Sequence, residues 1–385
     1  MRKICFITGT RAEYGIMSGL IKKVQQDNEL QLQIIATNMH LSPEYGMTYK
    51  EIEADGFYID KKVEMLLSSD TDAGTIKSMG VELIGMADAL GDLNPNLIVI
   101  LGDRYEMLMA ATAAMIMKIP VAHLYGGEVT EGAYDDNIRH AITKLSHLHF
   151  TSTQEYRKHI IQMGENPSCV YWVGALGADN IHNTKLMPRE ELEQNLNFNF
   201  GEHSMLITYH PVTMEKGTAE DQTKALLLAL NEFPEYSLLF TYPNSDGGGR
   251  IIRQLIDGFC TQRSNAKAFA SLGRLRYFSS LRNVDVVVGN SSSGLAEAPC
   301  FGIPTLNIGD RQKGRAQGTT IINCLSEKQS IVDNLHKALS EKFKLECKSC
   351  DCPYVRQNTL NSIFDVIKEH SLDGLIRKHF YHIKF

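Results

Sequence analysis

The sequence lacks a long hydrophobic run and any broad excess of positive charge. The apolar run at the N-terminus, KICFITG, soon reaches Arg11 and Glu13 and is too short for a signal peptide or a membrane span. A net charge of -6 without a basic face argues against a nucleic-acid partner. We therefore expect a cytoplasmic globular protein without membrane or nucleic-acid partners, and 385 residues allow two domains of ordinary size.

The eight cysteines are scattered, except for Cys347, Cys350 and Cys352 in ECKSCDCP. A zinc site of the usual kind needs a second pair of ligands at similar spacing, and the sequence has none. We predict no metal site here and expect reduced thiols at the protein surface.

Short apolar runs bounded by glycine or proline alternate with helix-like segments in both halves of the chain. In the first half they read KICFITG, LQLQIIAT, NLIVILGD and IPVAHLYGG, and in the second SMLITYHP, YSLLFTYPN, VDVVVGNSS and IPTLNIG. Such runs are typical of parallel strands buried on both faces, and YEMLMAATAAMIMKI suits a crossover helix between two of them. The pattern predicts an α/β fold with two Rossmann-like domains that face each other across a cleft.

We place the N-terminal domain at residues 1–172 and the C-terminal domain at 173–360. The remaining 361–385 read as a helical segment that packs back on the N-terminal domain. No complete dinucleotide fingerprint is present, so NAD is not indicated and no cofactor is expected.

Ligands of open α/β sheets collect at the carboxyl ends of the strands, so polar clusters that follow strands are candidate sites. In TGTRAEYG, Arg11 and the amides of a helix start suit a phosphate, although an ordinary turn with a surface arginine explains the same residues. In LGDRYEM, Asp103 is either a helix cap or, beside Arg104, part of a site.

The stretch HLYGGEVTEGAYDDNIRH concentrates acidic residues after an apolar run. Glu128 and Asp135 are candidates to share acid and base roles with Asp103. Asp135 has a second interpretation as a helix cap with Arg139 four residues on. Glu131 is expected to face solvent.

In the second half His210 follows one strand and the glycine-rich turn PNSDGGG follows the next. His210 is either structural or catalytic. The run GNSSSG opens a helix, which is either a serine-rich cap or a diphosphate site. The candidates after these strands are Asn244, Asp246, Ser291, Ser292 and Glu297, the last as an acceptor for ribose hydroxyls.

With these strings in order, the chain resembles the hydrolysing UDP-N-acetylglucosamine 2-epimerases, most closely the branch that supplies N-acetylmannosamine for sialic acid. The resemblance runs through GTRAEYG, GDRYEML, GGEVTEGAYDDNIRHAITKLSHLHF, YHPVT, PNSDGGG and GNSSSGLAEAP, over nearly the whole chain. It implies the GT-B arrangement of two domains, with UDP held mostly by the second. It also implies that the following residues surround UDP: Arg11, Arg104, His210, Asn244, Ser291, Ser292, Glu297 and Arg311.

The resemblance assigns Asp103 and Asp135 to catalysis, with one departure from the pattern. Many relatives carry a glutamate two residues after the histidine of HxEGGE, where this chain has Tyr125. Glu128 is the nearest replacement as proton carrier, and Tyr125 is a candidate for that role and for sugar contact.

The implied reaction converts UDP-N-acetylglucosamine and water into N-acetylmannosamine and UDP, through elimination to 2-acetamidoglucal and hydration. It needs neither metal nor nicotinamide, and relatives form homodimers or homotetramers. One alternative keeps the chemistry and takes UDP-N,N'-diacetylbacillosamine, on the way to legionaminic acid. Two others are a GT-B glycosyltransferase and a binding protein without turnover.

Overall fold

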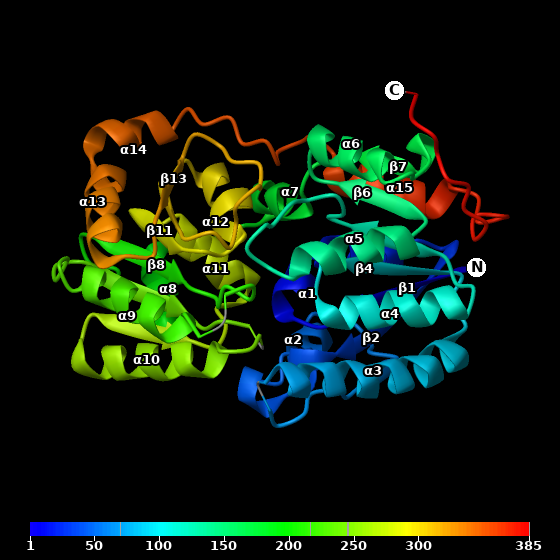
Figure 1. Cartoon of the computed structure of the whole chain (residues 1–385), viewed down its shortest axis with the longest axis horizontal. Coiled ribbons are helices and arrows are strands. Elements are labelled where there is room, and N and C mark those ends of the chain that lie inside the picture. Colours follow the sequence, from blue (N-terminus) through cyan, green and yellow to red (C-terminus); the bar gives the residue numbers. More distant parts are fainter. Residues whose placement is uncertain (70, 216, 245, 385) are drawn as a thin grey trace. The chain divides into compact units, whose positions relative to one another are not determined.

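The computed structural model describes residues 1–69, 71–215, 217–244 and 246–384, with the backbone alone for residues 182 and 183. The chain forms two compact units (Figure 1). Unit 1 consists of Met1–Glu128, Asp135–Asn180 and Tyr354–Phe385, and unit 2 of Val129–Tyr134 and Ile181–Pro353. These limits differ from the boundaries expected after residues 172 and 360, and six residues of the acidic stretch belong to unit 2.

Unit 1 is built on a seven-stranded parallel sheet in the order β3-β2-β1-β4-β5-β6-β7. The four apolar runs predicted for the first half form four of its strands. The strands are β1 (Arg2–Thr8), β2 (Leu30–Thr37), β3 (Lys61–Val63), β4 (Leu97–Leu101), β5 (Val121–Leu124), β6 (Leu148–Thr151) and β7 (Val170–Trp172). Every residue of β4, β5 and β6 is buried, as expected for strands covered on both faces.

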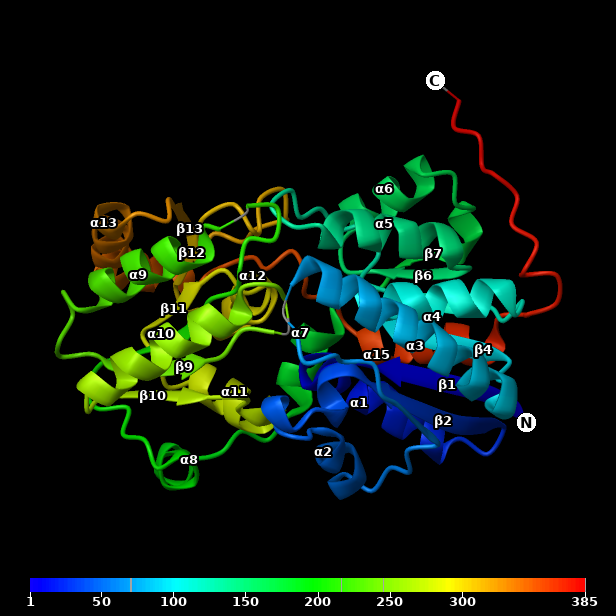
Figure 2. The same cartoon turned by 60° about the horizontal axis from the view of Figure 1, so that its bottom comes forward.

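Helices cover both faces of this sheet. On one face α1 (Arg11–Gln26) and α15 (Thr359–Glu369) pack on a core that includes Phe6 and Val99. On the other, α3 (Asp72–Leu93), α4 (Tyr105–Ile116) and α5 (Asp135–Leu145) enclose a second core. In Figures 1 and 2, α3 and α4 lie side by side. The smaller helices are α2 (Tyr49–Ala54), α6 (Gln154–Gln162) and α7 (Leu176–Asn183).

Unit 2 repeats the plan with a six-stranded parallel sheet in the order β10-β9-β8-β11-β12-β13. Its strands are β8 (Ser204–Thr208), β9 (Ser237–Thr241), β10 (Ala266–Phe269), β11 (Val286–Gly289), β12 (Thr305–Ile308) and β13 (Ile321–Cys324). Its helices are α8 (Arg189–Leu196), α9 (Ala219–Leu230), α10 (Gly249–Gln262), α11 (Gly273–Leu281), α12 (Ser293–Ala296), α13 (Lys328–Leu339) and α14 (Glu341–Cys347). Helices α9 and α10 lie side by side in both views (Figures 1 and 2).

Two expectations from the sequence are wrong. The predicted helical segment 361–385 is helical only to Glu369, because the following SLDG sequence turns the chain, with Gly374 at a φ of 70°. The side chains of Cys347 and Cys352 are buried rather than at the surface. Within the described ranges no helix is long and apolar enough to cross a membrane.

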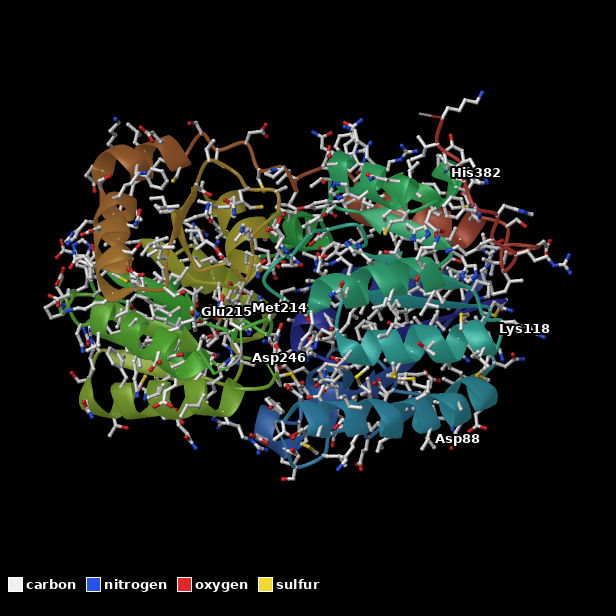
Figure 3. All side chains as sticks on the ribbon, viewed as in Figure 1. Asp88, Lys118, Met214, Glu215, Asp246 and His382 are labelled. Carbon is white, nitrogen blue, oxygen red and sulfur yellow. The ribbon has the colours of Figure 1, made fainter. Side chains whose placement is uncertain are left out.

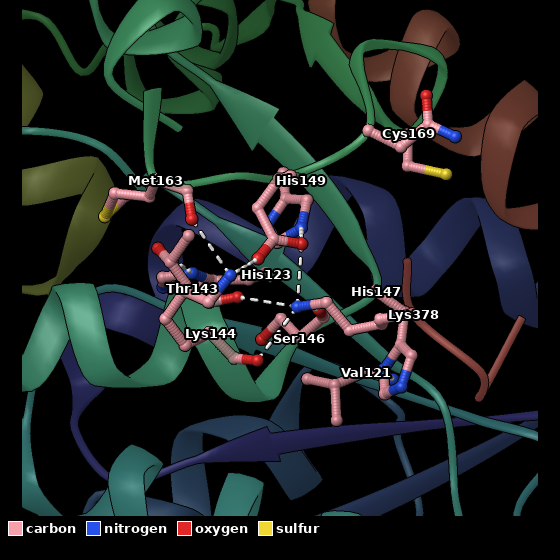
Figure 4. A network of polar contacts seen from close by, with 12 residues as sticks. Val121, His123, Thr143, Lys144, Ser146, His147, His149, Met163, Cys169 and Lys378 are labelled. Atoms are coloured by element: carbon pink, nitrogen blue, oxygen red, sulfur yellow. Dashed lines mark hydrogen bonds and ion pairs between the residues drawn. The ribbon is translucent and has the colours of Figure 1, made fainter. Parts of the chain in front are cut away.

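The segment after α15 is fixed to unit 1 by Lys378, whose ammonium group caps the end of α5 (Figure 4). Its Nζ donates to the carbonyl oxygens of Lys144 at 2.8 Å and Ser146 at 2.7 Å. It also lies 2.7 Å from Glu165, which accepts from Lys144 at 2.5 Å and from His149 at 3.2 Å. A cation at a helix C-terminus is favourable, so this contact stabilises α5 as well as the segment.

Candidate active site

In each sheet the strand order reverses at one place. Open α/β sheets bind their ligands at such a reversal, beyond the carboxyl ends of the strands. In unit 1 this place lies between β1 and β4, and in unit 2 between β8 and β11. Asp103 follows β4, and His210 and Ser291 follow β8 and β11. Each unit therefore carries its predicted polar motif at the position where its fold favours a ligand.

In unit 1 the acidic residues gather around Arg139, which is fully buried on α5. Its Nη1 donates to the carbonyl oxygen of Glu128 at 2.8 Å and to Oδ1 of Asp136 at 3.1 Å. Its Nη2 forms an ion pair with Oδ2 of Asp103. One guanidinium thus joins the end of β4, the loop after β5 and the first turn of α5.

Glu128 is buried, and its Oε1 accepts a hydrogen bond from Ser152 Oγ at 2.8 Å. The preceding Gly127 has a φ of 77°, and a Cβ there would lie 2.4 Å from the carbonyl oxygen of Tyr156. Only glycine fits this turn, which explains the second glycine of the GGE sequence and fixes the direction in which Glu128 leaves the sheet.

The helix-cap interpretations of Asp103 and Asp135 are wrong in detail. The N-cap of α4 is Arg104, one residue after Asp103. Asp135 is the first residue of α5, where a buried carboxylate interacts favourably with the helix dipole. Asp136 forms an ion pair within the helix with Arg139, three residues on, and the pairing of Asp135 with Arg139 stays a prediction. Glu131 is exposed, as expected.

Tyr125 has a φ of 67°, a left-handed conformation that is strained for an aromatic residue. Its ring packs against the core of unit 1. Its phenol oxygen accepts a hydrogen bond from the backbone N–H of Gly177, in the first turn of α7, at 3.0 Å. The phenol therefore anchors α7, which the sequence alone does not indicate.

Two amides of the turn after β1 are occupied by a side chain of the protein itself. The carboxylate of Glu13 accepts from the N–H groups of Gly9 at 2.9 Å and Thr10 at 3.1 Å, which completes a capping box on α1. The guanidinium of Arg11 donates to Glu51 of α2 at 2.6 Å. These contacts fit the ordinary-turn interpretation for the two amides, and the contact of Arg11 with UDP stays a prediction.

Arg104 is buried and donates from Nε to Oε1 of Glu106 at 2.8 Å, within a group of acidic side chains. Burial, with a further contribution from the charge of Glu106, raises the pKa of Glu13 to about 8. Burial also raises the pKa of Glu82 well above its ordinary value, and the charge of Glu106 adds to this shift. This acidic group lies beneath the turn after β1 and is not indicated by any motif.

In unit 2 the functional side chains are organised by Asn290, which is fully buried at the end of β11. Its side chain accepts from the N–H of His210 at 2.7 Å and donates to the His210 carbonyl oxygen at 2.8 Å. The carbonyl oxygen of Asn290 accepts from Arg311 at 3.1 Å and from Gln312 at 2.9 Å. Asn290 and Gln312 are candidate site residues that sequence reasoning missed.

Gly289, just before Asn290, allows β11 to approach β8 closely. Its φ is 132°, and a Cβ would lie 1.9 Å from the carbonyl oxygen of Thr208. The imidazole of His210 accepts from the N–H of Asn244 through Nδ1 at 3.4 Å, so the turn after β9 meets the end of β8. Asp246, labelled in Figure 3, is buried in the same turn, while Ser245 lies outside the described residues.

Ser291 and Ser292 are half-buried, and Ser292 is the N-cap residue of α12. Glu297 follows this four-residue helix rather than lying in its first turns, because Pro299 is close behind. Its Oε2 accepts from Ser293 Oγ at 2.5 Å, and Ser293 in turn contacts the Tyr277 hydroxyl at 2.5 Å. Burial raises the pKa of Glu297 to about 6.

The middle of the acidic stretch, Val129–Tyr134, packs within unit 2. The N–H of Glu131 donates to the Lys313 carbonyl oxygen at 2.9 Å, and the N–H of Tyr134 to Thr213 Oγ1 at 3.1 Å. A Cβ at Gly132 would lie 2.4 Å from the Asp310 carbonyl oxygen. This loop thus runs beside the segment that carries Arg311.

Comparison with known proteins assigns the chain to a family. The family model described as UDP-N-acetylglucosamine 2-epimerase matches residues 22–368. The chain belongs to the UDP-N-acetylglucosamine 2-epimerase family. The resemblance read from the motifs is confirmed at this level.

Three known proteins are similar to this chain over most of their own length. A GDP/UDP-N,N'-diacetylbacillosamine 2-epimerase (hydrolyzing) of Campylobacter jejuni is 42% identical and covers 98% of both chains. The polysialic acid biosynthesis protein P7 of Escherichia coli is 36% identical over 96% of this chain and 94% of its own. A UDP-N,N'-diacetylbacillosamine 2-epimerase (hydrolyzing) of Legionella pneumophila is 36% identical, covering 91% of this chain and 92% of its own.

The fold is also found in a solved 2-epimerase. The structure of UDP-GlcNAc 2-epimerase from Neisseria meningitidis bound to UDP-GlcNAc matches with a TM-score of 0.78 at 18% identity, over 95% of this chain and 99% of that one. The predicted fold class, two Rossmann-like domains with parallel sheets, is confirmed. Among the described residues no group of three or more His, Cys, Asp or Glu side chains could hold a metal ion.

Proposed function

We propose that the protein is a hydrolysing 2-epimerase of a UDP-linked 2-acetamido sugar. The observation that carries the proposal is the family assignment together with the acidic group around Arg139 at the strand-order reversal of unit 1. In unit 2, His210, Arg311 and the serines after β11 are the candidates to hold the diphosphate, and Glu297 the ribose. The cytoplasmic location and a homodimer or homotetramer stay predictions.

For the sugar we favour UDP-N,N'-diacetylbacillosamine, the second of the two substrates weighed from the sequence. Two of the relatives above carry this activity in their names, including the one at 42% identity. UDP-N-acetylglucosamine remains the alternative, supported by the description of the family model.

The proposed reaction begins with cleavage of the bond between the anomeric carbon and the UDP oxygen. The proton at carbon 2 is weakly acidic, so cleavage runs ahead of proton removal and leaves positive charge on the ring. Asp103, Glu128 and Asp135 are the candidates to stabilise this charge and to accept the proton, which gives a 2-acetamidoglucal. Water then adds hydroxyl at carbon 1 and a proton at carbon 2 from the opposite face, and the free epimerised sugar leaves.

Proton NMR in heavy water with each nucleotide sugar in turn tests this proposal. We expect UDP and a free 2-epimerised sugar with deuterium at carbon 2, formed faster from UDP-N,N'-diacetylbacillosamine. Faster turnover of UDP-N-acetylglucosamine would overturn the sugar assignment alone. Accumulation of an epimerised nucleotide sugar, or UDP release that needs an acceptor, would overturn the hydrolysing reaction.

Carboxylate variants test the roles of the acids. Asp103→Asn and Glu128→Gln are expected to lower kcat by about 100-fold or more, the usual loss when a group that transfers a proton or stabilises charge is removed. UDP affinity should stay nearly unchanged, because both residues lie in unit 1. The matched control is Glu131→Gln, an exposed residue of the same stretch, for which wild-type turnover is expected.

A further inference from the structure

Arg139 holds together the segments on which the proposed catalytic acids lie. It is fully buried, while the side chains of Asp103 and Asp136 keep 22% and 24% of their surface exposed. Its guanidinium therefore lies behind both carboxylates and fixes each through one nitrogen. The third acceptor, the Glu128 carbonyl oxygen, anchors the backbone that carries the Glu128 side chain.

A planar guanidinium suits this arrangement because its donors lie at fixed angles and its charge persists at every accessible pH. Two carboxylates near one another repel, and a cation between them allows both to stay ionised. Ionised carboxylates are what a reaction that leaves positive charge on the sugar requires.

Two histidines lie next to this cluster in the described part of the chain. His140, on the exposed side of α5, has its Nε2 at 3.4 Å from Oδ2 of Asp136. His123, on β5, bonds the Gly102 carbonyl oxygen at 2.7 Å, and burial lowers its pKa to about 3, so it stays neutral. Among the described contacts Arg139 is thus the cation that Asp103 and Asp136 share.

We propose that Arg139 is a positioning residue of the reaction, which aligns Asp103 and Asp136 and the backbone of Glu128 to stabilise the charge on the sugar and to accept its proton. The proposal rests on the function proposed above. It assigns Arg139 no contact with the substrate, so its loss should reduce the chemical step and leave nucleotide binding in place.

Two variants of Arg139 and a matched arginine test this role. Arg139→Lys keeps the charge but has one donor group instead of a fork, and we expect kcat to fall at least about tenfold with KM nearly unchanged. In Arg139→Met we expect kcat to fall by about 100-fold or more. The control is Arg157→Met: Arg157, on α6 of the same unit, also bonds backbone oxygens, those of Val170 at 2.9 Å and Pro167 at 3.1 Å, and should keep wild-type kcat.

A kcat that is higher in Arg139→Lys than in Arg139→Met, with the same KM in both variants, supports a positioning role. Wild-type kcat in Arg139→Lys, or a loss confined to KM, would overturn it. If Arg139→Met fails to fold, the kinetics of Arg139→Lys alone test the proposal. Circular dichroism then shows that Arg139→Lys is folded. Failure of the proposed function is separate, because the wild-type protein would then release no UDP from either sugar.

Discussion

The side chain of Asn290 and the backbone of His210 exchange two hydrogen bonds, of 2.7 and 2.8 Å, although the residues are 80 positions apart. Both backbone groups of His210 thus have a partner in a buried amide. The end of β8 is held to the end of β11 at the point where the sheet of unit 2 reverses its strand order.

Asn290→Ala should therefore weaken UDP binding at least tenfold. The substitution leaves two buried backbone groups of His210 unpaired, which costs about 1–3 kcal/mol for each and releases the histidine from its position. Calorimetric titration with UDP measures the effect. The control is Asn265→Ala. Asn265 directly precedes β10, and its amide donates to the carbonyl oxygens of Pro234 and Tyr236 before β9, so the variant should be less stable but bind UDP with wild-type affinity. Unchanged UDP affinity in Asn290→Ala would exclude this role.

Tyr125→Phe should lower the free energy of unfolding by about 1 kcal/mol, since it removes one hydrogen bond to the Gly177 amide. Because the phenol oxygen is used to anchor α7, we expect kcat to change by less than about threefold. Steady-state kinetics and urea unfolding give both quantities, with the exposed Tyr58→Phe as control. A loss of 100-fold in kcat would instead make the Tyr125 phenol the proton carrier.

Glu13→Gln should stabilise the protein at alkaline pH. Burial and then the charge of Glu106 raise the pKa of Glu13 to about 8, so the folded state binds a proton that the unfolded state has released above about pH 4.3. The protonated Glu13 therefore contributes its full share to the free energy of unfolding below about pH 4.3. This contribution is lost as the pH rises through 8. Relative to wild type, the variant should gain up to about 1.4 kcal/mol for each pH unit in this window.

Urea unfolding at pH 6 and 8 tests this prediction. The single tryptophan, Trp172, lies in β7 and therefore reports on unit 1 by its fluorescence. The exposed Glu190→Gln is the control and should show no pH-dependent difference. A constant difference between Glu13→Gln and wild type would mean that Glu13 is ionised in the folded protein.

Lys378→Met should destabilise unit 1 by about 3 kcal/mol, the usual cost of removing one partner from a buried ion pair. Burial alone would raise the pKa of Glu165, but hydrogen bonds from His149, Lys144 and Lys378 lower it to about 2. The variant leaves this carboxylate and the end of α5 with fewer donors. Lys158→Met, which breaks only an exposed pair with Glu155, should cost less than about 1 kcal/mol. Equal losses in both variants would contradict the prediction.

The long apolar strands and the helix between β4 and β5 could be predicted because burial on both faces leaves a clear local pattern. The strands β3, β7 and β13, of three or four residues, were not predicted. The four-residue strands β5, β11 and β12 could be predicted because each lies within a longer apolar run. The carboxyl ends of the strands correctly indicated where polar residues gather, since parallel strands end at one edge.

The partners of those polar residues could not be predicted. Asp103 and Arg139 are 36 positions apart and meet only after β4 and α5 are packed. Asn290 was overlooked because its neighbours are serines, whose role at a helix start is visible locally, while its own role depends on β8. The occupied amides of Gly9 and Thr10 were also hidden, because a capping glutamate and a phosphate satisfy the same groups.

The division of the chain affects the order in which the protein can fold during synthesis. Unit 1 needs α15 and the segment from Tyr354 onward, so it cannot be completed until that segment has left the ribosome. The sheet of unit 2 is finished earlier, because it lies wholly within Ile181–Pro353. The nascent N-terminal sheet must therefore wait, with the face that α15 will cover still exposed, and a holdase chaperone would have its clearest target there.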